Sequence, residues 1–202
     1  MTGSLKLTFG GAEANVSVSL AHLGLPAKYV TALPEGPLTA ACMDDLRGHG
    51  VDVSGIRVTQ EGRFGLYFVE RGANQRPSTV TYDREGSAIS VASASIYGWD
   101  ELLSDARWLH TTGITPAISE RAAEATLEAV QAAGTRSIPV SFDLNFRKKL
   151  WRWEAGSDPR ALAGRVVREI LPHVTVLIGN EEDAEDVLGI RAGESKVDSG
   201  EL

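Results

Sequence analysis

The stretch "SIPVSFDLNFRKKLW", residues 137–151, decides the fold, because an apolar run of strand-forming residues ends abruptly in polar and charged ones. Its first half, "SIPVSFDL", has the composition of a buried strand. The polar segment that follows leads into an amphipathic pattern from about Pro159 to Ile170, which predicts a helix. The stretch therefore begins one unit of strand, polar turn and helix.

The same unit occurs twice more in the second half of the chain. "ARWLHTTGITPAIS", residues 106–119, precedes a predicted helix from about Ser119 to Ala133, and "VTVLIGNEED", residues 174–183, ends in a helix that Asn180 can cap. Successive units of this length predict a parallel sheet with right-handed crossovers. The fold class is therefore α/β.

The first half of the chain has a different order of elements. Val16, Leu20 and Leu23 keep helical spacing from Ala12 up to Gly24. Its predicted elements are a strand at 5–9, that helix at 12–23, a strand at 28–33, a helix at 38–47 and extended chain at 51–58.

A hairpin is predicted in "GLYFVERGANQRPSTVTYDREGSA", residues 65–88. If Arg71 lies opposite Ser78, Tyr67 pairs with Tyr82, and both tyrosines share one face with Arg84. Any register shifted by two residues keeps these groups together. The face is either the wet side of an ordinary amphipathic hairpin or a platform for a polar ligand.

Composition excludes several classes of protein. The 202 residues carry 27 acidic against 20 basic side chains, a net charge of -7, with no basic run, which disfavours a nucleic-acid partner. Cys42, the single cysteine, suits a reducing compartment and a packing role. No apolar run approaches the roughly 20 residues of a membrane span, and the first residues resemble no signal peptide. We expect a cytoplasmic protein without nucleic-acid or membrane partners.

Parallel sheets bind ligands beyond the carboxyl ends of their strands, which directs attention to "TTGITP", "DLNFRKKLW" and "GNEED". Arg147 can bind a carboxylate or phosphate with two parallel hydrogen bonds, or it forms a surface salt bridge. The acidic run 181–183 suits the start of a helix.

The four histidines show no metal-ligand spacing, and His110 is expected to be a hydrogen-bonded core residue. The sequence contains no GxGxxG, P-loop, GxSxG or HExxH motif.

Together these segments resemble the ribokinase-like, or PfkB, family of carbohydrate kinases, and within it the 2-keto-3-deoxygluconate kinases. The resemblance rests on five segments in the family's order: "GGAEANVSVSLAHLG", the hairpin, "GITPAIS", "FDLNFRKKLW" and "NEED". It implies a parallel sheet with helices on both faces and a small β-sheet lid. Residues 1–202 would form one partial domain, with lid strands at about 5–9 and 63–86 and an α/β core at about 12–60 and 90–202.

The resemblance also implies the roles of individual residues. ATP and Mg²⁺ would be the cofactors, with Asn180 near the nucleotide phosphates and Asp183 in an indirect metal role, at a position where the family usually has glutamate. The sugar acid would be bound by the lid and by the ends of the strands, with both arginines available to its carboxylate. The residues concerned are Gly11, Tyr67, Tyr82, Arg84, Ile114 and Arg147.

The resemblance predicts an ATP-dependent kinase of a keto sugar acid such as 2-keto-3-deoxygluconate, assembled as a homo-oligomer through its lid. No catalytic residue is assigned, because the glycine-rich DTxGAGD-like segment that carries the family's catalytic aspartate does not occur in the 202 residues. We therefore expect an incomplete C-terminus and no activity from this chain by itself. The alternatives are a fructokinase or another sugar kinase of the family, and a non-catalytic sugar-binding or dimerisation module.

Overall fold

The computed structural model describes residues 5–191. The chain divides into two compact units, residues 1–102 and 103–202, and each is described by itself. The structure is a mixed α/β fold with parallel sheets, as the sequence predicts. Within residues 5–191, no helix has the length and apolar character needed to cross a membrane.

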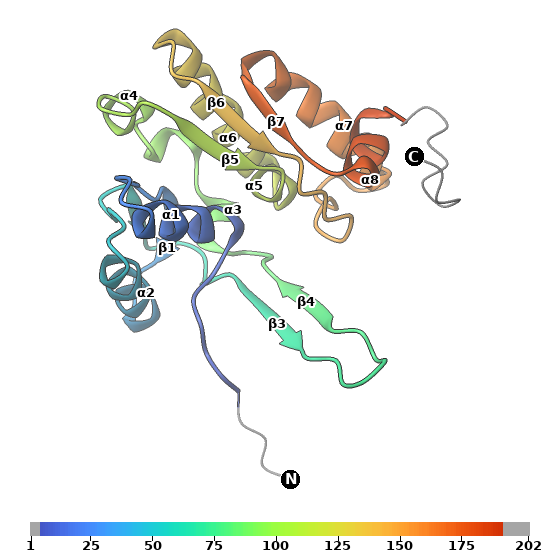
Figure 1. Cartoon of the computed structure of the whole chain (residues 1–202), viewed down its shortest axis with the longest axis horizontal. Coiled ribbons are helices and arrows are strands. Elements are labelled where there is room, and N and C mark those ends of the chain that lie inside the picture. The colour runs from blue at the N-terminus through green and yellow to red at the C-terminus, as the bar shows by residue number, and fades with distance from the viewer. Residues whose placement is uncertain (1–4, 192–202) are drawn as a thin grey trace. The chain divides into compact units, whose positions relative to one another are not determined.

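The first unit pairs two helices with a short parallel ladder, and a separate antiparallel hairpin extends from it (Figure 1). Its elements are α1 (Ala12–His22), β1 (Thr31–Pro34), α2 (Pro37–Gly48), β2 (Ile56–Thr59), β3 (Leu66–Glu70), β4 (Thr79–Asp83), α3 (Ala88–Val91), η1 (Ala94–Ile96) and α4 (Trp99–Leu102).

The core of the first unit forms where α2 packs on the chain leading into β2. Apolar residues of α2 keep helical spacing, so they lie on one face. The buried cluster contains Cys42, Leu46, Val51, Val53 and Ile56. Cys42 thus has the packing role that its sequence neighbourhood predicts, and its burial raises the pKa of its thiol.

The hairpin has the predicted register. Tyr67 pairs with Tyr82 and Val69 with Val80 in the antiparallel ladder of β3 and β4. The loop between the strands closes with a hydrogen bond of 3.1 Å from the Gly72 N–H to Ser78 Oγ. Both tyrosines therefore project from the same face.

The second unit is the three-strand parallel sheet β5–β6–β7 with α6 and α7 along it (Figure 1). Its elements are β5 (Leu109–Thr112), α5 (Ile114–Ala117), α6 (Glu120–Thr135), β6 (Val140–Asp143), α7 (Pro159–Ile170), η2 (Leu171–His173), β7 (Val176–Ile178), α8 (Glu181–Asp183) and the π-helical turn η3 (Ala184–Leu188).

The middle strand β6 is buried along most of its length, on both faces of the sheet. Val140 and Phe142 are fully buried, as are Val130 of α6 and Ile170 of α7. Side-chain caps begin both long helices: Ser119 Oγ accepts from the Ala122 N–H at 3.0 Å, and Asp158 caps α7 in the same way.

One predicted element is absent. Residues 5–10 form no strand, although "LKLTF" alternates as a strand should. The reason is that Leu5 and Leu7 are 88% and 61% exposed, and only Phe9 packs, with its ring centroid 6.2 Å from that of Phe64. Without a paired edge among residues 5–191, alternation alone does not make a strand. The proposed lid and core boundaries otherwise stay predictions.

Candidate functional site

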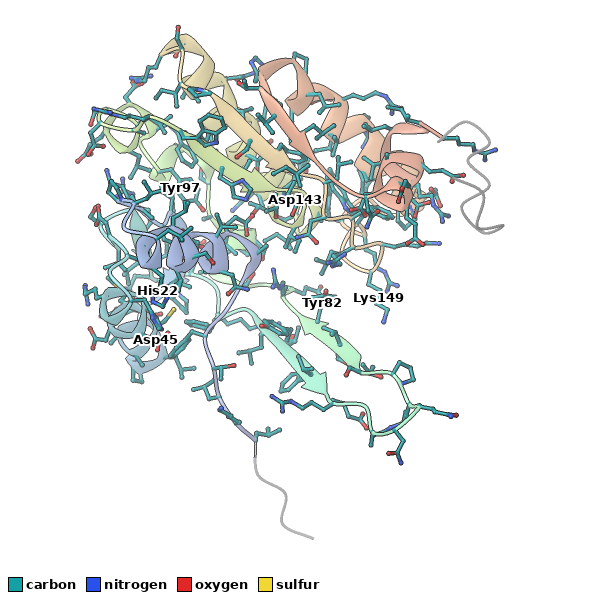
Figure 2. The ribbon with its side chains drawn as sticks, in the orientation of Figure 1. His22, Asp45, Tyr82, Tyr97, Asp143 and Lys149 are labelled. Carbon is teal, nitrogen blue, oxygen red and sulfur yellow. The ribbon has the colours of Figure 1, made fainter. Side chains whose placement is uncertain are left out.

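The polar face of the hairpin is built around one guanidinium group. The Cζ atom of Arg84 lies 6.0 Å from the ring centroid of Tyr67 and 5.7 Å from that of Tyr82, which is labelled in Figure 2. Both distances are within the range of cation–π attraction. No carboxylate of residues 5–191 pairs with Arg84. The rings thus hold the charge in place while its hydrogen-bond donors stay available.

Gly10, the first glycine of the pair before α1, lies against this face. A Cβ atom on Gly10 would be 3.1 Å from Tyr67 Oη and 3.6 Å from Asn15 Oδ1. Gly11 is the N-cap residue of α1, and because it has no side chain, no side-chain cap satisfies the first N–H groups of the helix. The two glycines therefore let a ligand approach both the phenol and the backbone N–H groups closely.

Tyr29 is a neighbour of this site that the sequence does not reveal. The pKa of its phenol rises because burial disfavours the phenolate and because the charge of Glu13 repels it, while Arg84 acts in the opposite direction. Tyr29 thus stays neutral and lies within electrostatic reach of Arg84. The segment "KYVTAL" predicts only a strand, and nothing in it indicates that Tyr29 lies near Arg84.

In the second unit, backbone hydrogen bonds join the carboxyl ends of all three strands. The Gly113 N–H donates to Asp143 O at 2.8 Å, and the Leu144 N–H donates to Ile178 O at 2.8 Å. Asn145 has a positive φ of 35°, an uncommon left-handed conformation, and its N–H donates to Asp143 Oδ1 at 3.1 Å. The polar turn after β6 is therefore fixed to both neighbouring strands.

Ile114 and Arg147 follow two of these strand ends. Ile114 is buried at the start of α5, and its N–H donates to Thr112 Oγ1 at 3.2 Å. Arg147 is exposed, and its Nη1 donates to the carbonyl oxygen of Phe146 at 3.2 Å. Within the described part of the chain, Arg147 forms no salt bridge, so the surface-ion-pair interpretation is not observed there.

Asp143, labelled in Figure 2 at the end of β6, has an altered acidity. Burial raises the pKa of its carboxyl, and the nearby charge of Asp183 adds to this, while the hydrogen bond from Asn145 opposes it. A carboxyl with a raised pKa at a strand end is a candidate for proton exchange with a ligand.

Asn180 acts as the predicted helix cap, since its Oδ1 accepts from the Asp183 N–H at 2.7 Å. Asp183 Oδ1 in turn accepts from the Phe146 N–H at 3.2 Å. Among residues 5–191, no cluster of three histidine, cysteine or acidic side chains is arranged to hold a metal ion. Mg²⁺ usually binds through one or two carboxylates together with substrate phosphates, so the indirect metal role of Asp183 stays a prediction.

His110 is hydrogen-bonded, as the sequence predicts. Its Nδ1 lies 2.8 Å from Ser141 Oγ, which also accepts from Trp108 Nε1 at 2.9 Å. The structure thus distributes the predicted site residues over both units: Gly11, Tyr67, Tyr82 and Arg84 in the first, and Ile114, Arg147, Asn180 and Asp183 in the second.

Open parallel sheets bind ligands beyond the carboxyl ends of their strands, where Asp143, Ile114 and Arg147 lie in this chain. Residues 2–199 match the model of the pfkB family carbohydrate kinases. The chain belongs to this family.

Two relatives are named as kinases of dehydro-deoxy sugar acids. A 2-dehydro-3-deoxygalactonokinase of Haloferax volcanii is 37% identical over 185 residues, which are 92% of this chain and 55% of the relative. A 2-dehydro-3-deoxygluconokinase of Thermoproteus tenax is 32% identical over 183 residues, covering 90% of this chain and 53% of the relative.

The crystal structure of 2-dehydro-3-deoxygluconokinase from Thermotoga maritima superimposes with a TM-score of 0.87 at 43% identity. It aligns with 94% of this chain, which in turn covers 56% of that protein. The chain therefore spans about half the length of the relatives it matches. The structural match and the family match agree with the ribokinase-like fold class that the sequence predicts.

Proposed function

We propose that the chain is the sugar-binding part of an ATP-dependent kinase that phosphorylates a hydroxyl group of a keto sugar acid such as 2-keto-3-deoxygluconate. The family relationship supports transfer of a phosphoryl group to a sugar. The names of the relatives support a deoxy keto acid as the acceptor.

The position of Arg84 is the observation that favours a sugar acid over a neutral sugar as the substrate. Its guanidinium lies over two tyrosine rings without a carboxylate partner among the described residues. Stacking limits the motion of the group and leaves its N–H donors for a planar anion, which a sugar carboxylate supplies and a neutral hexose does not. We propose that Tyr67 and Tyr82 orient Arg84 and that the Tyr67 hydroxyl contacts a sugar hydroxyl.

Phosphoryl transfer requires placement more than covalent chemistry. The acceptor hydroxyl has to lie in line with the γ-phosphate of the nucleotide, and positive charge has to stabilise the transferred group. The proposed role of Gly11, Arg84, Ile114 and Arg147 is to hold the sugar acid, and that of Asn180 is to lie near the phosphates. No residue of the chain is assigned as the catalytic base.

Calorimetric titration of the chain with 2-keto-3-deoxygluconate tests the carboxylate contact. Loss of a charge-assisted hydrogen bond costs about 1.5 to 3 kcal/mol, so Arg84→Ala should weaken binding roughly 10-fold to 150-fold. Tyr67→Phe, which removes only a hydroxyl, should weaken it by no more than about 10-fold. A coupled assay with ATP on a protein that contains these residues tests the transfer itself.

Arg71→Ala is the matched control, because it removes the same charge from the same hairpin at an exposed position next to its loop. It should leave the affinity for the acid unchanged. Fructose, a neutral sugar, serves as the second ligand. If Arg84→Ala keeps its preference for the acid over fructose, Arg84 does not bind the carboxylate. If fructose binds as tightly as the acid to the unaltered chain, the sugar-acid assignment fails and fructokinase becomes the better interpretation.

A further inference from the structure

Two histidines that are far apart in the sequence meet at the surface of the first unit. His22 lies at the end of α1 and is labelled in Figure 2, and His49 is the C-cap residue of α2. His22 Nε2 lies 3.1 Å from His49 Nδ1, the ring centroids are 5.2 Å apart, and both side chains are exposed. Nothing in the proposed sugar site uses this pair.

The packing beneath the pair fixes this approach. A Cβ atom on Gly50 would lie 3.8 Å from the Cβ of Ala21, so the ends of the two helices are in contact next to the histidines. Gly50 has a φ of +84°, which reverses the chain directly after His49. The backbone therefore brings the two side chains to the same place on the surface.

The separation of the two nitrogens suits a shared metal ion. Imidazole nitrogens bind Zn²⁺ at about 2.0 to 2.1 Å, so two nitrogens 3.1 Å apart would subtend an angle of about 98° at the ion. This lies between the roughly 90° of octahedral and the roughly 109° of tetrahedral coordination. Binding requires the rings to rotate until both lone pairs point at the ion.

The electrostatic surroundings favour a cation. Both helices end at the pair, and the C-terminal end of a helix carries partial negative charge. Arg47, a cation of the last turn of α2, forms a salt bridge of 2.8 Å with Asp44, which offsets its charge. The acidic side chain of Asp45 lies one turn before His49.

We propose that His22 Nε2 and His49 Nδ1 together bind one transition-metal ion of the class that prefers imidazole, namely Zn²⁺, Ni²⁺ or Cu²⁺. No third histidine, cysteine or acidic side chain of residues 5–191 completes the site, so water molecules fill the remaining positions. Two protein ligands and exposure to solvent give moderate and reversible affinity. The ion would link the ends of α1 and α2.

The competing account is a simple hydrogen bond between the rings, in which one N–H donates to the other nitrogen. Metal binding needs both facing nitrogens without protons. The ring that donates the bond then carries its proton on its other nitrogen, so neutral histidines release no proton when the ion binds. The two accounts differ in their response to added metal and not in the resting geometry.

Calorimetric titration of the untagged chain with ZnCl₂, and separately with CuSO₄, distinguishes them. The expected result is one ion per chain, with affinity at least about tenfold weaker in His22→Ala and in His49→Ala. Paramagnetic resonance of bound Cu²⁺ should show two coordinating nitrogens, and one in each single variant.

His173→Ala is the matched control, since it removes an imidazole that lies outside the pair, in η2 of the other unit. It should leave the affinity unchanged. Circular dichroism shows whether each variant is folded; His22 and His49 are exposed, and His173 is half-buried. If ions bind equally well to both single variants, or if neither ion binds below about 1 mM, the proposal is wrong and the pair is only a hydrogen bond.

Discussion

Gly113→Ala is expected to destabilise the junction of β5 and β6. The same substitution at a glycine with open space around it should cost much less. A Cβ atom on Gly113 would lie 2.2 Å from the carbonyl oxygen of Leu144 and 3.2 Å from its carbonyl carbon. Gly113 itself has φ -65° and ψ -6°, which alanine adopts without strain. The whole effect is therefore steric, and it falls on backbone atoms that cannot rotate away.

The magnitude follows from what has to move. Overpacking a well-packed region costs about 1 to 3 kcal/mol, and contact with backbone places this change at the upper end of that range. The shift also strains the 2.8 Å hydrogen bond from the Gly113 N–H to Asp143 O, worth roughly 1 kcal/mol. For a unit of this size, a loss of about 3 kcal/mol lowers the melting temperature by roughly 12 to 24 °C.

Thermal unfolding followed by circular dichroism measures the shift. Gly134→Ala is the control, because the nearest atom to its new Cβ would be 3.7 Å away and the residue lies in α6. Alanine in a helix is favoured over glycine by up to about 1 kcal/mol, so this control should melt at the same or a slightly higher temperature. A Gly113→Ala protein that melts within about 2 °C of the unaltered chain would refute the close approach of the two strand ends.

Two further predictions concern the same unit. Ser119→Ala removes the cap of α6 and should lower the free energy of unfolding, measured by urea denaturation, by about 1 kcal/mol. Thr135→Ala, at the other end of that helix, should change it by less than about 0.5 kcal/mol. Equal losses would contradict the capping role. The raised pKa of Asp143 means that the folded state holds its proton more tightly than the unfolded state, so this contribution to stability is present below the ordinary pKa and is lost as the pH rises through the raised one. Relative to Asp143→Asn, the unaltered chain should lose stability as the pH rises from below the ordinary pKa of an aspartate to above the raised one, and a relative gain would contradict the burial argument.

Elements with a strong local pattern could be predicted from the sequence. The helix at 159–170 has the predicted bounds because a proline follows a capping aspartate at its start. The hairpin register follows from alternation, since a slip by one residue would reverse which face carries Tyr67 and Tyr82. These features depend on residues that are close in the sequence, so the sequence contains the information.

Other features depend on packing between distant segments, and local patterns do not encode them. Alternation in residues 5–9 predicts a strand, but a strand needs a partner edge, and Leu5 and Leu7 lie exposed without one in the described structure. The approach of His22 to His49 requires two helix ends to meet across 27 positions of sequence. The same holds for Tyr29, whose relation to Arg84 arises only in the folded unit.

Asp183 connects two segments that the sequence separates. Its carboxylate accepts a hydrogen bond from the Phe146 N–H and so joins the start of α8 to the turn after β6. That bond uses one carboxylate oxygen, and the charge of Asp183 also raises the pKa of Asp143. The side chain therefore holds together the segment that carries Arg147, which is a structural contribution to the proposed sugar site that does not depend on any metal ion.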